Sequence, residues 1–146
     1  MRKLTEVEEA KALMTEALDW SVMKWLKEKK RVRKTADRAN DALDQLSKET
    51  KLMWADDLRT TYCDLGRNVK PANKPDDEML KSLAQVKHAD DEAFRARMDA
   101  ENTFDQAERQ LSTSMAREGC RKAIYSWELH EKAIRIAERL IPPASR

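Results

Sequence analysis

Apolar residues recur three and four positions apart along two long stretches of the chain, with charged residues between them. In the first stretch the series runs through Leu4, Val7, Met14 and Leu18, and it continues in a shifted phase from Val22. Steps of three and four place these side chains on one stripe of an α-helix, the seam of a coiled coil. The pattern predicts an all-α protein. The phase shift near Leu18 indicates that different helix faces are buried on its two sides.

Glycine and proline divide the chain into two arms. Neither residue occurs from position 5 to 65, which predicts a first helix over about 5–65, roughly 90 Å long if unbroken. One glycine and one proline, Gly66 and Pro71, then mark a loop at 66–74, and a second proline, Pro75, follows it. The second helix is expected over about 75–141, with a bend near Gly119, before a tail at 142–146 that begins with two prolines.

Two arms of similar length joined by one loop favour an antiparallel coiled-coil hairpin that forms a single domain over 1–146. In this hairpin, residues whose numbers add to roughly 141 lie side by side. The alternative is a compact four-helix bundle, which requires breaks near 29–35 and near Gly119. The hairpin is favoured because 29–35 contains no glycine or proline.

Composition agrees with a thin helical protein. Charged residues make up 38% of the chain and hydrophobic residues 40%, with a mean hydropathy of −0.85. This is too polar for a large round core and too apolar for a disordered chain. No run of about 20 apolar residues and no secretory signal is seen, so we expect a cytoplasmic protein with free thiols at Cys63 and Cys120.

The net charge is only +2, so an electrostatic function would depend on local clusters. One cluster stands out early in the chain, opposed only by Glu28. It is a candidate patch for binding nucleic acid or an anionic membrane, and its members are Lys24, Lys27, Lys30, Arg31 and Lys34. The simpler interpretation is the solvated face of a long helix.

Large apolar residues exceed what one seam between two helices can bury, since the chain has four Trp, two Tyr and seven Met. Trp20 and Trp25 stand about 140° apart on a continuous helix, so they cannot both enter one narrow seam. We therefore expect a homodimer with Trp20, Trp25 and Trp54 as candidate contact residues.

Catalytic and metal-binding patterns are absent from the sequence. His88 precedes Asp91 and Glu92 by three and four residues, but the Glu-x-x-His motif of di-iron bundles does not occur. There is also no glycine-rich phosphate loop. We expect no enzyme activity, cofactor or small-molecule substrate. The predicted function is a structural or adaptor role through helix–helix contacts, in a homodimer or with a protein partner. The alternative is binding of nucleic acid or an anionic membrane through the basic cluster.

Overall fold

The structure, a computed structural model, describes the backbone of residues 2–65 and 77–140 and the side chains of 2–50, 81–82 and 84–140. The predicted loop at 66–74 and tail at 142–146 lie outside the described residues. The described residues form four helices: α1 (Thr5–Ala17), α2 (Val22–Leu65), α3 (Asp77–Gln110) and α4 (Thr113–Leu140). No strand occurs among the described residues. The all-α prediction is confirmed.

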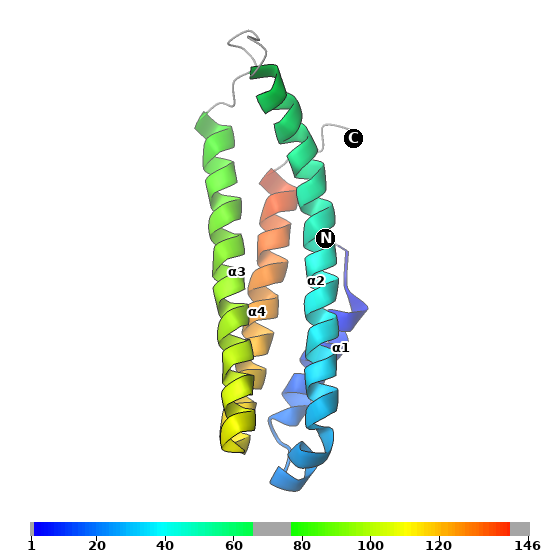
Figure 1. Ribbon diagram of the computed structural model, residues 1–146. Helices are drawn as coiled ribbons and strands as arrows, with labels where there is room; N and C mark the ends of the chain where they lie inside the picture. The colour runs from blue at the N-terminus through cyan, green and yellow to red at the C-terminus, as the bar shows by residue number, and fades with distance from the viewer. Residues whose placement is uncertain (1, 66–76, 141–146) are drawn as a thin grey trace.

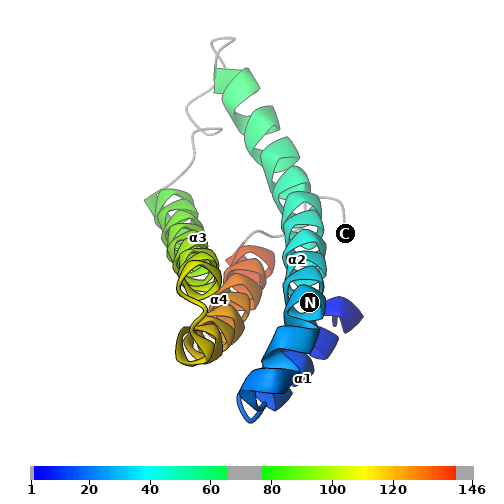
Figure 2. The ribbon, with the colours of Figure 1, turned by 60° about the horizontal axis from the view of Figure 1, so that its bottom comes forward.

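The helices pack in two antiparallel pairs, α1 with α2 and α3 with α4, and α4 also contacts α1 and α2 (Figures 1 and 2). The turn between α1 and α2 and the turn between α3 and α4 lie at the same end of the molecule, at the bottom of Figure 1. We call this the closed end. The arrangement is compatible with the four-helix-bundle alternative, and α3 and α4 form an antiparallel hairpin.

The first arm is divided at Leu18–Ser21 instead of running unbroken over 5–65 or breaking near 29–35. At the end of α1 the N–H groups of Asp19 and Trp20 donate to carbonyl oxygens three residues back, at 3.1 and 3.2 Å. Ser21 then starts α2, because its Oγ accepts the N–H of Lys24 at 3.2 Å and satisfies a free donor of the first turn. The break coincides with the phase shift near Leu18.

The second arm is divided at Leu111–Ser112, not at Gly119. The N–H of Ser112 donates to Ala107 at 3.0 Å and that of Leu111 to Glu108 at 3.4 Å, the two bonds of a Schellman motif. Ser112 Oγ in turn accepts the N–H of Met115 at 3.2 Å and starts α4. A serine therefore starts the second helix of each antiparallel pair.

Gly119 lies inside α4, where it permits a close approach between helices. A Cβ at this position would lie 2.8 Å from Cδ1 of Phe104 on α3. Since real Cβ atoms essentially never come this close, the ring of Phe104 occupies the space that any other residue would need. The predicted bend is replaced by a contact that sets how closely α3 and α4 pack.

The predicted pairing of the two arms is seen in the ion pairs. Arg33 contacts Glu108, Arg97 contacts Asp44, and Lys11 contacts Glu131, and the numbers in each pair add to roughly 141. A buried hydrogen bond also connects α4 with α2: Trp127 Nε1 donates to Asn40 Oδ1 at 2.9 Å. The core around this bond is made of apolar residues from α1, α2, α3 and α4.

Candidate functional site

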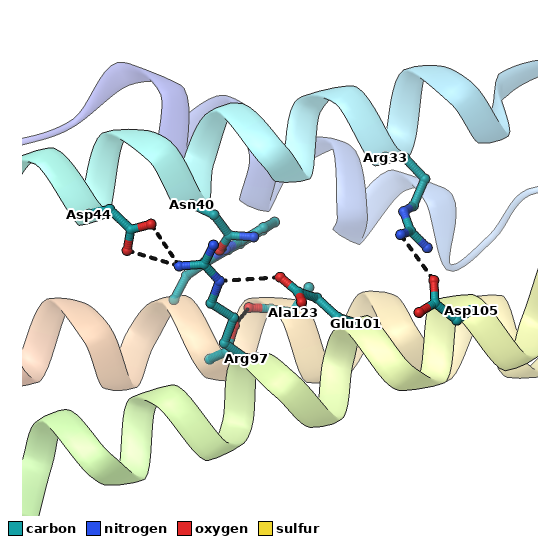
Figure 3. A network of polar contacts seen from close by, with 9 residues as sticks. Arg33, Asn40, Asp44, Arg97, Glu101, Asp105 and Ala123 are labelled. Atoms are coloured by element: carbon teal, nitrogen blue, oxygen red, sulfur yellow. Dashed lines mark hydrogen bonds and ion pairs between the residues drawn. The ribbon is translucent and has the colours of Figure 1, made fainter.

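Arginine side chains bridge the side of the molecule formed by α2 and α3, which we call the α2–α3 face (Figure 3). Arg97 of α3 donates from Nη1 to both carboxylate oxygens of Asp44 on α2, at 2.9 and 2.8 Å. Its Nε lies 3.3 Å from Glu101, while Arg33 of α2 reaches Asp105 of α3 at 3.2 Å. Burial acts to lower the pKa of Arg97, but the hydrogen bonds and charges of Asp44 and Glu101 outweigh it and raise that pKa. Long side chains thus join α2 and α3, and depressions form beside them.

An apolar pocket of about 90 Å³ lies on the α2–α3 face at the closed end. Buried Trp25, Val32 and Phe104 line its inner part. Leu26 and Leu111 also line it, although they are 53% and 79% exposed. The described part of the chain therefore leaves an apolar pocket whose outer leucines face solvent.

Leu111 has an unusual backbone conformation for a leucine. Its φ of 50° is the only positive value among the non-glycine residues that the structure describes. Glycine or asparagine is favoured at such a helix end, because the left-handed conformation costs other residues about 1 kcal/mol. The chain thus holds a large, exposed apolar side chain where a smaller residue would be less strained, and strained residues cluster at functional sites.

The five members of the predicted basic patch are all exposed on the first part of α2. Lys30, Arg31 and Lys34 line a depression that shares Arg33 and Glu108 with the pocket. Two have acidic neighbours, since Lys24 lies 3.6 Å from Glu16 and Arg31 lies 3.3 Å from Glu28. The remaining three, Lys27, Lys30 and Lys34, form no ion pair with any residue that the structure describes. The patch therefore adds uncompensated positive charge to the closed end.

Trp20 and Trp25 lie in the core and are only 4% and 6% exposed. Their rings meet edge to face, with centroids 5.3 Å apart. Both indoles are buried together because the break at Leu18–Ser21 removes the 140° separation that a continuous helix would impose. The side chain of Trp54 lies outside the described residues. Trp20 and Trp25 thus present little surface to a second copy, whereas Leu26 beside them does.

Two exposed apolar residues on α3 were not predicted from the sequence. Phe94 and Met98 are 63% and 39% exposed and stand one helical turn apart. Both lie off the seam that passes through Ala93 and Ala100. Apolar residues four apart outside a seam are the signal that identifies them. Phe94 also lines a second, more polar depression on the α2–α3 face, together with Asp91.

Few side chains in the described part of the chain are arranged as catalytic or metal-binding groups would be. His88 Nε2 lies 4.0 Å from Glu92 on an exposed helix surface. No group of three His, Cys, Asp or Glu side chains able to hold a metal ion occurs among the described residues. Cys120 is a buried free thiol. Burial raises its pKa from 9.0 to about 12, although the charge of Arg121 acts in the opposite direction.

The raised pKa predicts that Cys120 resists alkylation. In a Cys63→Ser background, iodoacetamide should label the native protein slowly at pH 9 and faster only as the pH approaches 12, because the thiolate is the reactive form. The contribution of the protonated thiol to stability is fully present below pH 9 and is lost as the pH rises toward 12. Unfolding in urea at pH 9 should restore rapid labelling, measured by mass spectrometry. Rapid labelling of the native protein at pH 9 would contradict the prediction.

Comparison with known proteins gives no relative for this arrangement: no family model matches the sequence, and neither a curated protein nor a solved structure is similar to it. Within the described residues, no helix combines the length and the apolar character needed to cross a membrane.

Proposed function

We propose that the protein is a non-enzymatic structural or adaptor protein that binds a helix on its α2–α3 face. The pocket at the closed end receives apolar side chains of that helix. The function expected from the sequence is helix–helix contact. The proposal assigns that contact to a defined surface.

The observation that carries the proposal is Leu111, which is 79% exposed, adopts a left-handed conformation and lines an apolar pocket. Its side chain adds little to the core because it faces solvent. Helix-binding grooves recognise apolar anchors spaced three or four residues apart, and a pocket of about 90 Å³ suits part of one such anchor. Leu111 and Leu26 would cover the anchor once it is bound.

The charge around the pocket favours an acidic helix as the partner. Lys30 and Lys34 are exposed, line a depression that shares Arg33 and Glu108 with the pocket, and form no ion pair with described residues. Complementary charge increases the association rate and selects among partners. The same lysines support the alternative function, binding to nucleic acid or an anionic membrane. We favour a helix because the basic residues adjoin an apolar pocket, which phosphate groups alone would not fill.

The test uses designed amphipathic peptides with Phe and Leu anchors one turn apart and with acidic, neutral or basic flanking residues. Fluorescence anisotropy should show the tightest binding for the acidic peptide. Leu111→Asn should weaken this binding about tenfold, the effect of losing one good apolar contact. The same change should leave stability unchanged or raise it by up to about 1 kcal/mol, because asparagine tolerates the left-handed conformation.

The matched control is Tyr125→Asn, which alters a residue 55% exposed on α4 and outside the pocket. It should leave peptide binding unchanged. Failure of the monomeric chain to bind any of the three peptides would refute the proposal. Binding to anionic vesicles or RNA in the absence of peptide binding would instead favour the alternative function.

A further inference from the structure

The α2–α3 face has two unlike parts. The pocket and the exposed Lys30 lie at the closed end. Farther along, α3 carries the exposed apolar pair Phe94 and Met98 next to Asp91. Lys30 and Asp91 form no ion pair with described residues. One part thus offers an apolar pocket with positive charge, and the other offers apolar side chains with negative charge.

The two parts are placed so that a two-fold rotation exchanges them. Phe94 and Glu108 lie about four turns apart on α3, roughly 20 Å, and Glu108 lines the pocket. Glu101 lies midway, and the spacing of seven residues keeps all three on one stripe of the helix. A two-fold axis that lies in the plane of the face and crosses α3 at Glu101 would bring Phe94 of one copy opposite Glu108, at the pocket of the other.

We propose that this face binds a second copy of the chain in an antiparallel arrangement. Phe94 of each copy enters the pocket of the other, and Asp91 lies against Lys30. The inference rests on the proposed helix-binding function and names its partner. It also differs from the dimer contact predicted from the sequence at Trp20, Trp25 and Trp54, because the indoles of Trp20 and Trp25 are buried within the chain.

Symmetry makes the proposal sharply testable, because every contact across a two-fold axis occurs twice. Lys30→Glu should create two repulsions between acidic groups in its homodimer, and Asp91→Lys should create two between basic groups. A mixture of the two variants restores attraction at both places. Neither variant changes a buried residue, so both should fold normally.

The experiment measures self-association of the full chain by sedimentation at equilibrium. Each charge-reversal variant should raise the dimer Kd about tenfold, and an equimolar mixture should recover wild-type affinity, with the heterodimer identified by a fluorescent label on one variant. Phe94→Ala should raise the Kd about 100-fold, since each dimer loses two anchors worth about tenfold each. The controls Lys132→Glu and Tyr125→Ala alter exposed positions on α4 and should leave the Kd unchanged.

Two results would overturn the inference: a wild-type chain that sediments only as the 17.0 kDa monomer, or a mixture of charge variants that does not recover affinity. Neither result affects the interpretation of the peptide-binding experiment. A monomer that binds the acidic peptide would retain the helix-binding function with a different partner. A monomer that binds no peptide would refute both proposals.

Discussion

Replacing Trp127 with alanine should lower the free energy of unfolding by about 4 kcal/mol, in the range found for removal of a large buried aromatic side chain. Trp127 is 1% exposed, and its indole N–H donates to Asn40 Oδ1 at 2.9 Å. The change therefore creates a cavity and also removes the hydrogen-bond donor of a buried amide. Urea denaturation followed by far-ultraviolet circular dichroism measures the loss.

Two further variants separate the hydrogen bond from the packing at this site. Asn40→Leu and Trp127→Phe should each cost about 1–3 kcal/mol, because each removes one side of the buried bond. The double variant should cost less than the sum of the two, since no polar partner is then left unpaired. Tyr125→Ala, an exposed position on the same helix, should change stability by no more than about 0.5 kcal/mol. A loss below about 1 kcal/mol for Trp127→Ala would contradict the packing described.

Gly119→Ala should destabilise the protein by about 2 kcal/mol, although alanine is normally favoured over glycine in a helix by about 1 kcal/mol. The sign is reversed because the added Cβ would lie 2.8 Å from Cδ1 and 2.9 Å from Cε1 of Phe104. Phe104 is itself only 6% exposed, so its ring has little room to move. Thermal unfolding should show a lower midpoint for this variant.

A compensating change tests whether Phe104 is the cause. Phe104→Leu removes the ring atoms that meet the new Cβ, so Gly119→Ala should cost less in the Phe104→Leu background than in the wild type. An increase in stability for Gly119→Ala alone would show that α3 and α4 pack less closely than the structure has them.

The repeat of apolar residues and the distribution of glycine determined the fold class. Steps of three and four specify helices, since only a helix gathers such residues on one side. The absence of glycine and proline over 5–65 and the loop signals at 66–74 separated the two arms. Two arms of nearly equal length then fixed the pairing that the contacts of Arg33, Arg97 and Lys11 follow.

The breaks within the arms could be predicted only in part. The first break coincides with the phase shift near Leu18, although the repeat there predicts only a change of buried face within one helix. Ser21 and Ser112 carry no sequence signal that distinguishes a helix start. Serine occurs inside helices as well as at their N-caps. Its role at a given position therefore depends on whether tertiary packing stabilises a turn there. Leu111 gave no turn signal at all, because leucine is among the best helix formers.

The candidate site depended on the tertiary structure. The sequence identified the basic patch, because charge is a property of residues alone. The pocket, the burial of Trp20 and Trp25 and the exposure of Phe94 depend on the distances between helices. Those distances are set by contacts between residues far apart in the chain, such as Gly119 with Phe104 and Arg97 with Asp44. Periodicity determines which side of a helix is apolar, whereas the volumes of remote side chains decide how much of that side is covered.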